Sequence, residues 1–479
     1  MAWFPDSVHG RLSNRLAANT DERTEGGGIP SAAADKPWVP TAVGERCLHG
    51  GAAVPERPFM PSCQGRPDTA GPSVPGLPAG PYENAAAFGR PVRSRGGMAL
   101  RSEERRERRY RRRRMSREAR RRDAILATGG LDAALSLRSL VDASHHCQRG
   151  VAWKRNVQGF CLNRVLQCAR LYQMWLSGAY APGEAKRFTV SERGKTRSIS
   201  AVPFRDRVVQ RALCDTVLVP LVRRTLIYDN GASLKGKGTS FSLDRLERHL
   251  REHYRRHGAV GGILLFDFSK FFESIDVNKL VAMMDGALGY PPLVRFVELF
   301  LRSEERGLGL GNQTSQTGAI FYPSGIDHWV KETWRVRGYG RYMDDGYALF
   351  ADWDEMKRFA IAFQKQCAAL GIAVNPRKFR MVPATAPFVF LKTRFQLDER
   401  GRVHRRVCAE GLKREKRRLR KFRSMIGEGR ISYGDAARSY ASWRGTLARG
   451  DAAGFLQCKM DRYFYAVFGV PWRECLACQ

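Results

Sequence analysis

Two stretches of the sequence place acidic side chains where β-strands are otherwise apolar. Residues 261–268 form a short apolar run that predicts a buried strand, and Asp267 stands near its end. Residues 339–350 have apolar flanks that meet at Asp344 and Asp345, a pattern typical of a β-hairpin with a tight turn. Adjacent carboxylates repel each other, and a divalent cation shared between them removes the repulsion. These two stretches therefore constrain the fold more than any other part of the chain.

The three carboxylates Asp267, Asp344 and Asp345 are a sufficient ligand set for Mg²⁺. This ion takes hard oxygen ligands in a near-octahedral shell and commonly combines a few carboxylates with substrate phosphates. Two such ions, ~3.5–4 Å apart, activate an attacking hydroxyl and stabilise a departing pyrophosphate. Mn²⁺ is the alternative ion. Taken alone, an Asp-Asp turn is most often a solvated hairpin tip, so the motif by itself leaves both interpretations open.

Hydrophobic periodicity in the rest of the chain predicts a mixed α/β body. Helical patterns cover 131–177, 204–220, 240–256, a run ending at 330–334, 352–370 and most of 410–470, and further strands are expected at 372–374 and 388–391. Hydrophobic residues make up 43% of the composition, which excludes a fully disordered chain. No stretch approaches the roughly 18 consecutive apolar residues of a membrane span.

The chain of 479 residues has 82 Lys and Arg against 47 Asp and Glu, a formal charge of +35. A charge of this size predicts a polyanionic partner, either nucleic acid or an acidic membrane surface. Residues 1–97 contribute almost none of it, with 10 basic and 9 acidic residues. They hold 13 of the 23 prolines, so we expect a disordered extension. Met98 is an alternative start, in which case the extension is not native protein.

The excess charge is concentrated in two predicted helices. Residues 101–122 contain 13 Arg and 4 Glu with favourable i, i+4 pairs, and nucleic-acid contact is predicted for Arg111, Arg112, Arg113 and Arg114. The alternative is a solubilising basic arm. The second helix has an apolar stripe through Leu419 and Phe422, and its residues predicted to face a nucleic-acid backbone are Lys413, Arg414, Arg417, Arg418 and Lys421.

The 11 cysteines favour a reducing compartment, because their number is odd and most stand singly within apolar stretches. Cys475 and Cys478 form the only close pair, a weak zinc or redox signal for which unpaired thiols are the simpler interpretation. The first residues do not combine a basic start, an apolar run and a small-residue cleavage site, so no signal peptide is expected. A cytoplasmic location is expected.

The order of motifs between residues 185 and 395 resembles the fingers and palm of reverse transcriptases. Tyr342-Met-Asp-Asp345 follows a strand, and Asp267 with a double Phe lies about 75 residues upstream. Further blocks resemble the family's fingers strands and helix, its next fingers block, its template and nucleotide loop, its lysine-bearing block and its primer grip: 192–200 with 203–210, 228–239, 311–316, 370–378 and 388–393. The resemblance implies an α/β (α+β) right-hand polymerase fold with fingers, palm and helical thumb, and RNA-directed DNA polymerase activity.

The resemblance also implies roles for individual residues. The metal ligands for two Mg²⁺ would be Asp267, Phe268, Asp344 and Asp345. Lys378 would be a catalytic residue that protonates pyrophosphate, with a structural salt bridge as the alternative. The implied nucleotide-binding residues are Lys195 and Arg197 at the triphosphate, Phe272 against the ribose 2′ position, and Leu310, Gly311 and Gln316 in the template loop. Phe272 would restrict the enzyme to deoxynucleotides, and its alternative role is a core residue.

Residue 310 also bears on the subclass. Leu310-Gly311 and Ser315-Gln316 stand where group II intron and retroviral enzymes have Gln-Gly and Ser-Pro. This pattern resembles the prokaryotic reverse transcriptases of diversity-generating retroelements, which copy template adenines unfaithfully. Leu310 removes a hydrogen-bonding amide beside the incoming nucleotide, which weakens base selection. The alternatives are a phage-defence or other retroelement reverse transcriptase, and a catalytically inactive RNA-binding palm protein.

The implied domain plan has five parts: a disordered extension over 1–97, an Arg-rich arm over 98–125, N-terminal helices and fingers over 126–260, the palm over 261–395, and the thumb with a C-terminal tail over 396–479. The implied partners are an RNA template, the primer, the cDNA product and dNTPs. A small basic accessory protein encoded nearby is a further expected partner, and no membrane is expected.

Overall fold

The computed structural model describes residues 95–192 and 195–477. The predicted disordered extension falls almost wholly on residues 1–94 and lies outside the described residues. The elements from Glu107 onward belong to one compact unit.

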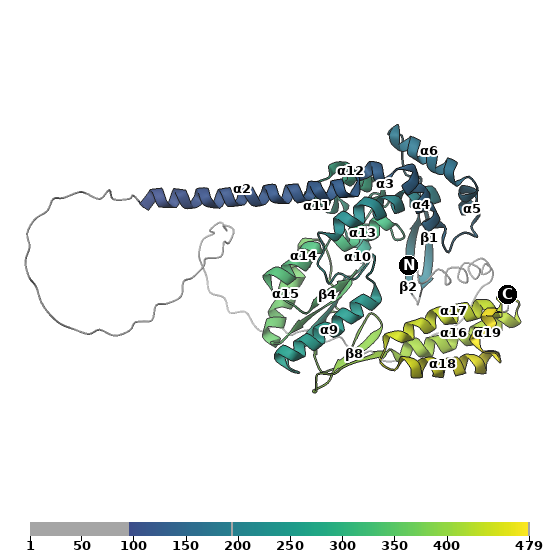
Figure 1. The fold of residues 1–479 in the computed structure, drawn as a ribbon. Helices are drawn as coiled ribbons and strands as arrows, with labels where there is room; N and C mark the ends of the chain where they lie inside the picture. Colours follow the sequence, from purple (N-terminus) through teal and green to yellow (C-terminus); the bar gives the residue numbers. More distant parts are fainter. Residues whose placement is uncertain (1–94, 193–194, 478–479) are drawn as a thin grey trace, which may run out of the picture. The chain divides into compact units, whose positions relative to one another are not determined.

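The Arg-rich stretch is a long helix, α2 (Arg95–Thr128), which confirms the helix predicted there (Figure 1). Residues 102–122 are exposed, and ion pairs at i, i+4 spacing join Arg111 to Glu107 and Arg114 to Glu118. Near its end, Ala124 is buried in the main core. The helix is therefore attached through its last turns.

The helical pattern over 131–177 is confirmed as four helices: α3 (Gly130–Ala134), α4 (Leu137–Gln148), α5 (Arg155–Leu162) and α6 (Arg164–Leu176). Ser136 caps α4 by accepting a hydrogen bond from the Ser139 backbone N–H, which ends the preceding turn and starts the next helix. The inner faces bury Leu140, Cys168 and Leu171 in the main core. A hairpin of β1 (Lys186–Glu192) and β2 (Lys195–Ala201) follows.

The central sheet carries the acidic residues and has four antiparallel strands in the order β4–β5–β3–β6. The strands are β3 (Gly262–Asp267), β4 (Tyr339–Tyr342), β5 (Asp345–Phe350) and β6 (Arg380–Pro383). The strand and hairpin predicted from the apolar runs are confirmed. Phe266 of β3 packs in the main core, whereas Leu265 packs in a second core on the other face. Because both faces are covered, β3 is apolar throughout.

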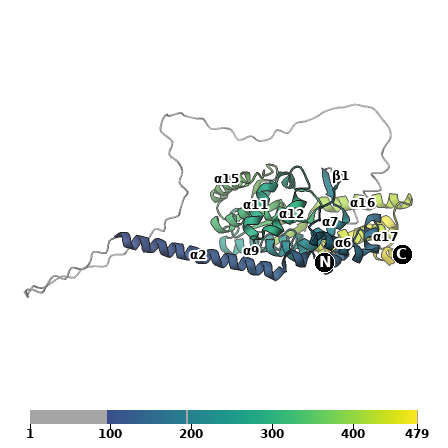
Figure 2. The ribbon, with the colours of Figure 1, turned by 90° about the horizontal axis from the view of Figure 1, so that it is seen from above.

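Helix α9 (Thr239–His257) lies along one face of this sheet, where Leu246 and Leu250 join the second core (Figure 1). Helices α11 and α12 lie side by side in Figure 2 and belong to the main core. The helices from the fingers region through the sheet are α7 (Phe204–Leu213), the π-helical turn η1 (Cys214–Leu218), α8 (Val219–Arg223), α10 (Phe271–Ser274), α11 (Val277–Leu288), α12 (Pro291–Leu301), α13 (Gln313–Phe321), α14 (Ser324–His328), the π-helical turn η2 (Trp329–Thr333) and α15 (Trp353–Ala369).

One predicted strand is wrong. Residues 372–374 form no strand, and Val374 makes only an isolated bridge with Phe268. The short run turns into Asn375-Pro376, and proline has no N–H to extend a ladder. The strand predicted at 388–391 is confirmed within a separate sheet of β7 (Phe388–Phe390), β8 (Thr393–Leu397) and β9 (Val403–Val407).

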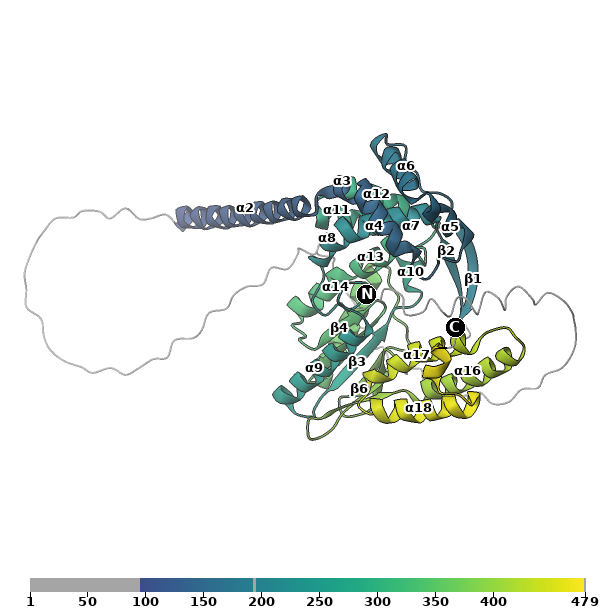
Figure 3. The same cartoon turned by 45° about the vertical axis from the view of Figure 1, so that its right-hand side comes forward.

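The C-terminal helices form a bundle with its own core (Figure 3). They are α16 (Ala409–Gly427), α17 (Tyr433–Gly445), the 3₁₀ turn η3 (Thr446–Arg449), α18 (Ala453–Phe468) and α19 (Trp472–Ala477). Leu419, Phe422 and Met425 of α16 are buried there, which confirms the apolar stripe.

Within the described part of the chain, no single helix is both long and apolar enough to cross a membrane. One bent pair, Ser102–Ala134 with Leu137–Gln148 at 79°, passes that test of length and composition only when the two are taken together.

Candidate active site

The sheet register brings the three predicted carboxylates together. Asp267 at the end of β3 is paired directly with Asp345, the first residue of β5, and Asp344 precedes it in the hairpin loop. The Phe268 backbone N–H donates to the Asp344 carbonyl at 3.1 Å, which ties the loop to the end of β3. One carboxylate oxygen from each aspartate lies within 4.8 Å of the other two. The predicted acidic site is therefore assembled by pairing of strands whose facing residues, Asp267 and Asp345, are 78 positions apart in the sequence.

The turn is held in an unusual backbone conformation. Met343, the first loop residue, has a φ of 55°, the positive value that a tight hairpin loop requires. Gly346 lies opposite Phe266, and a Cβ at this glycine would come within 2.2 Å of the Phe266 ring. Glycine thus lets an aromatic side chain pack beneath the acidic turn.

Burial makes the negative charge of the site costly. It raises the pKa of Asp344 above its usual value, and the charge of Asp267 adds to the effect. The pKa of Asp345 is raised to about 7, mainly by burial, with contributions from Asp344 and Asp267 that Lys378 partly offsets. A carboxylate cluster with raised pKa values gains most from a cation. Three hard oxygen donors at this spacing could hold a divalent metal ion.

Phe268 offers only its backbone to such an ion, because its ring is buried in the main core. The predicted ligand at this position would be the backbone carbonyl oxygen.

Lys378 and Asn375 contact the site from the segment after α15. Lys378 Nζ lies 2.5 Å from Asp267 Oδ1 and 3.5 Å from Asp345 Oδ1. Burial alone would lower the pKa of Lys378, but the hydrogen bond to Asp267 and the charge of Asp345 raise it. The structure thus shows the salt bridge that was the alternative role for Lys378, and the same ammonium group contacts two of the three carboxylates.

Asn375 is a functional residue that sequence reasoning missed. Its side-chain Nδ2 donates to Asp267 Oδ2 at 2.9 Å, and its backbone N–H donates to the Asp267 carbonyl at 2.7 Å. The residue lies in the block that resembles the family's lysine-bearing motif, three positions before Lys378. The first hydrogen bond orients the Asp267 carboxylate, and the second ties the Asn375 backbone to the end of β3.

A fully buried ion pair supports the turn from behind. Arg341 Nη2 lies 2.6 Å from Asp327 Oδ2, and both side chains have no exposed surface. Tyr339 also donates to Asp327 at 2.6 Å. Arg341 Nη1 then donates to the Met343 carbonyl at 2.9 Å. The guanidinium therefore holds the residue whose positive φ shapes the acidic turn, a role that the sequence did not suggest.

The predicted triphosphate residues lie on the β1–β2 hairpin. Arg197 is exposed on β2, and its charge lowers the pKa of Asp344 and so acts against the effect of burial. Lys195 begins β2, and its side chain lies outside the described part of the chain. Phe272 is half-buried, and its ring meets Phe271 edge-on at 6.0 Å. It contacts the main core, as the alternative role proposes, and keeps part of its surface exposed.

The predicted template loop is fastened to β2. The Ser200 backbone N–H donates to the Leu310 carbonyl at 3.0 Å, and a Cβ at Gly311 would lie 3.1 Å from the Ser200 carbonyl. Gly311 has a φ of 113°, so glycine is required by the backbone itself. Glu304, which sequence reasoning missed, accepts a hydrogen bond from Ser200 Oγ and lies 3.3 Å from Arg187. Gln316 is half-buried on α13.

The two basic helices differ in how much of their charge is available. Arg111 to Arg114 are all exposed on α2. On α16, four of the predicted residues are exposed, and so is Arg420, which was not predicted: Lys413, Arg414, Arg417 and Lys421. Arg418 does not face outward as predicted. Its guanidinium lies 2.6 Å from the buried Glu415 and donates to the Ser439 carbonyl, so it faces the bundle.

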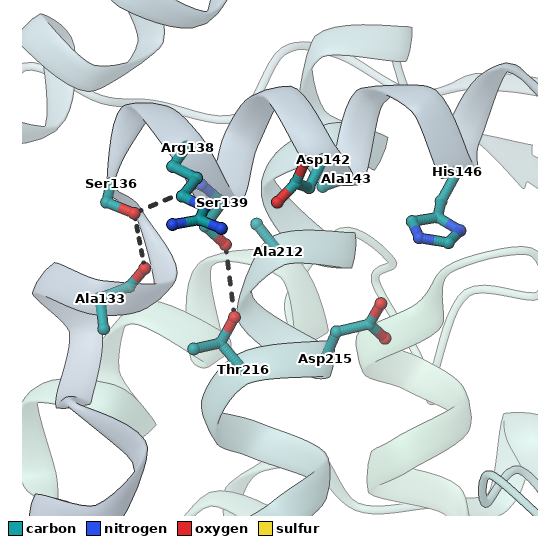
Figure 4. Close-up of a pocket in the computed structure, with 10 residues that line it drawn as sticks. All are labelled: Ala133, Ser136, Arg138, Ser139, Asp142, Ala143, His146, Ala212, Asp215 and Thr216. Atoms are coloured by element: carbon teal, nitrogen blue, oxygen red, sulfur yellow. Dashed lines mark hydrogen bonds between the residues drawn. The ribbon is translucent and has the colours of Figure 1, made fainter.

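A hollow of about 310 Å³ lies between α4 and the α7–η1 segment (Figure 4). Its wall carries acidic residues, Asp142 and Asp215, and basic residues, Arg138 and His146, while Ser139 and Thr216 hydrogen-bond to each other at 3.3 Å. This mixed lining favours no single charge of ligand, and none of the predicted site residues lies in it.

The described cysteines Cys161, Cys168, Cys214 and Cys367 are free thiols. Cys475 is buried in the C-terminal bundle, and Cys478 lies outside the described residues, so the predicted pair is not tested.

Comparison with known proteins gives a family match and distant structural neighbours. Residues 185–395 match the family described as "Reverse transcriptase (RNA-dependent DNA polymerase)". A structure of telomerase from Candida albicans in complex with a fragment of telomeric RNA is 11% identical with a TM-score of 0.38, and the match covers 66% of each chain. Apo telomerase from Candida tropicalis, truncated from its C-terminal domain, is 12% identical with a TM-score of 0.36, covering 48% of this chain and 60% of that one. No curated protein matches the chain.

The chain thus spans less than two thirds of the length of either telomerase structure. The family match has the limits predicted from the motifs, and the predicted right-hand polymerase fold, a mixture of helices and strands, is confirmed. Residues 185–395 of this chain are a reverse transcriptase domain, the domain of RNA-directed DNA polymerases.

Proposed function

We propose that the protein is an RNA-directed DNA polymerase that makes cDNA by two-metal nucleotidyl transfer. The observation that supports this most directly is the cluster of Asp267, Asp344 and Asp345, whose carboxylates meet within 4.8 Å inside a reverse transcriptase domain. An inactive palm protein that only binds RNA has no need to keep three mutually repelling carboxylates in a buried turn.

The carboxylates would hold two Mg²⁺, or Mn²⁺ as the alternative, with the Phe268 carbonyl as a further ligand. The bound ions supply charge neutralisation for the triphosphate and lower the pKa of the attacking hydroxyl. Asn375 and Lys378 orient Asp267. Lys378 Nζ lies 2.5 Å from Asp267 Oδ1 and 3.5 Å from Asp345 Oδ1, and we propose that from this position it gives a proton to pyrophosphate.

Arg197 contributes a positive charge on the triphosphate side, and Lys195 is proposed beside it. Phe272 is proposed to exclude ribonucleotides, because its side chain is only half-buried. Its backbone is tied to the segment before the template loop, where the Leu308 backbone N–H donates to the Phe272 carbonyl at 2.8 Å. Leu310, Gly311 and Gln316 would contact the template base pair. The RNA template, the primer and the cDNA would lie against the exposed arginines of α2 and the exposed basic residues of α16.

The finer proposal is a diversity-generating retroelement enzyme with mutagenic copying. It is supported by Leu310, whose backbone is fixed by Ser200 and whose side chain offers no hydrogen bond to a base. A phage-defence or other retroelement reverse transcriptase is the alternative. The five-part domain plan, a cytoplasmic location and a small basic accessory protein stay predictions.

Primer extension on an RNA template with dNTPs and Mg²⁺ tests the activity. The wild type should extend the primer, and the double variant Asp344→Asn with Asp345→Asn should not. A wild type without product, or a double variant with undiminished product, would contradict the proposal.

Sequencing the cDNA tests the subclass. Errors concentrated opposite template adenines support the diversity-generating proposal, and Leu310→Gln should reduce them. Errors spread evenly over the four template bases would favour the alternative enzymes.

A further inference from the structure

The template loop is attached at two points, one on either side of the exposed Gly311. Before the glycine, the Leu310 carbonyl accepts a hydrogen bond from the Ser200 backbone N–H at 3.0 Å. After it, the Gln313 backbone N–H donates to the side-chain oxygen Oε1 of Gln210 at 3.1 Å. Only two residues separate the attached positions, so a shift at either of them is passed directly to Gly311.

Gln210 is held firmly in place. It belongs to α7, and the nearby Val209 and Leu213 of this helix are buried in the main core. The Gln210 side chain is itself only 1% exposed, and α7 packs against α13. A side chain on a packed helix positions its partner more precisely than a side chain on a loop.

The oxygen of Gln210 supplies what the start of α13 lacks. The first N–H groups of a helix have no partner within the helix, and the side chain of the N-cap residue Asn312 accepts no hydrogen bond from them. Gln210 Oε1 accepts from the Gln313 N–H and also from the Thr314 hydroxyl at 3.3 Å. Gln210 Nε2 has no hydrogen-bond partner among the described residues. The oxygen is therefore the atom through which Gln210 holds the loop.

The two attachments depend on the sequence in different ways. The bond from Ser200 joins backbone atoms, so it does not depend on the side chain at either end. The bond to Gln210 requires a side chain of one length that ends in an acceptor, a combination that glutamine and glutamate share and methionine lacks. The Gln210 attachment is thus the one that a substitution can release.

We propose that Gln210 is a positioning residue that sets how Leu310 and Gly311 lie against the nascent base pair. The inference rests on the proposed function, in which these two residues contact the template base pair. Gln210 acts through the start of α13, whereas the acidic site is held independently by the pairing of β3 with β5. Releasing the loop should therefore weaken nucleotide binding and leave the chemical step nearly unchanged.

A purely structural role for Gln210 makes a different prediction. A helix cap stabilises the fold, and its loss lowers the free energy of unfolding without changing how the folded protein binds a nucleotide. The KM for the incoming dNTP separates the two roles, because a positioning residue affects it in the folded protein and a cap alone does not.

Primer extension by the full chain on a defined RNA template measures this KM. Gln210→Met keeps the side-chain length and removes the acceptor, so it should raise the KM for the correct dNTP about 10-fold, less than the ~10²-fold cost of a 1 Å misplacement, and change kcat less than about 3-fold. Gln210→Glu keeps the oxygen at a helix N-terminus that favours a negative charge, so its KM should return to within about 3-fold of the wild type.

Tyr180→Phe is the matched control. Tyr180 donates to Asp206 Oδ1 at 2.8 Å, a buried hydrogen bond to the same helix α7. Losing this bond should lower the midpoint of urea unfolding, as Gln210→Met does, but it should leave the KM for dNTP unchanged.

Thr314→Val provides a milder form of the same test. It removes the longer of the two hydrogen bonds to Gln210 Oε1 and should raise the KM by a smaller factor. In the Gln210→Met background it should add nothing, because the acceptor is already gone. If Gln210→Met does not fold, a wild-type KM in Thr314→Val overturns the proposal.

Three results would overturn the inference while leaving the polymerase activity intact: an unchanged KM in Gln210→Met, a raised KM that Gln210→Glu does not restore, or an equal rise in Tyr180→Phe. A wild type that makes no product would instead defeat the proposed function, and the inference with it.

Discussion

Two groups of carboxylates are linked to the Met343 turn, one through Arg341 and the other through the neighbouring Asp344, and their charges are balanced in opposite ways. Asp327 is fully buried and is matched by Arg341 and Tyr339. The second group consists of Asp267, Asp344 and Asp345, which also lie close together. Among the ion pairs of the described residues, Lys378 is the one cation that contacts this group. The charge of Asp327 is neutralised by Arg341, whereas the second group keeps an excess of negative charge. An excess of this kind marks the group that is built for a cation.

The largest expected effect is the loss of primer extension when a carboxylate of the second group is replaced. Asp344→Asn should lower primer extension ~10³-fold or more, because several kcal/mol of charge stabilisation in the transition state depend on the metal ligands. The free energy of unfolding should stay the same or rise by up to about 1 kcal/mol, because a repelling charge is removed. Extension assays and urea unfolding of the same preparation measure both. A large loss of stability would show that Asp344 is structurally compensated like Asp327.

The buried pair should behave in the opposite way. Asp327→Asn leaves the Arg341 guanidinium buried without a countercharge, and breaking such a pair costs about 3–5 kcal/mol of folding free energy. Asp327→Leu with Arg341→Met removes both charges and should recover a large part of that loss. The double variant should still extend primers poorly, because the Met343 carbonyl has lost its donor. Full activity in the double variant would contradict the role of Arg341 in holding the turn.

A third buried carboxylate, Asp229, allows the comparison to be tested by measuring stability against pH. Asp229 is paired with Arg245 at 2.6 Å and Lys331 at 2.9 Å, and His249 lies 3.6 Å away. The pKa of His249 is lowered to about 4, mainly by burial; the charge of Asp229 opposes this shift, and the charges of Lys331 and Arg245 add to it. An unfolded histidine titrates near 6.5.

The pKa of His249 is lower in the folded protein than in the unfolded chain. Above about pH 6.5 the histidine is neutral in both states, so the fold has its full stability there. That stability is lost as the pH falls toward 4, by an amount of the order of 3 kcal/mol. His249→Gln should flatten this part of the stability profile, measured by urea unfolding at pH 7.5, 6 and 5. His145→Gln, at an exposed position on α4, is the control and should leave the profile unchanged.

The sequence was sufficient for those features that depend on local pattern. The apolar run before Asp267 and the apolar flanks of the Asp344 turn predicted the strands, and strand pairing then placed the carboxylates together. Contacts between distant residues left no such pattern. Asn375 reaches Asp267 across 108 residues, and Arg341 meets Asp327 from a different element. Arg341 reads in the sequence as one more surface arginine, and only the packed structure shows that it is buried.

The smallest expected effect is on the salt dependence of nucleic-acid binding, and it compares two adjacent arginines of α16. Arg417 is exposed on α16, and the adjacent Arg418 is bound to the buried Glu415. If α16 contacts nucleic acid, Arg417→Ser should flatten the slope of log K against log salt by up to about 0.9 on a duplex. Arg418→Ser should leave the slope unchanged.

Arg418→Ser should instead lower the free energy of unfolding by about 1–3 kcal/mol, because a buried carboxylate loses its partner. Burial already raises the pKa of Glu415 to about 7, so this carboxyl is protonated in the fold at low pH and the loss should be small at pH 5. The loss should grow as the pH rises through about 7, where Glu415 becomes charged. Equal salt slopes for the Arg417 and Arg418 variants would show that pairing with Glu415 does not decide which arginines of α16 meet the nucleic acid.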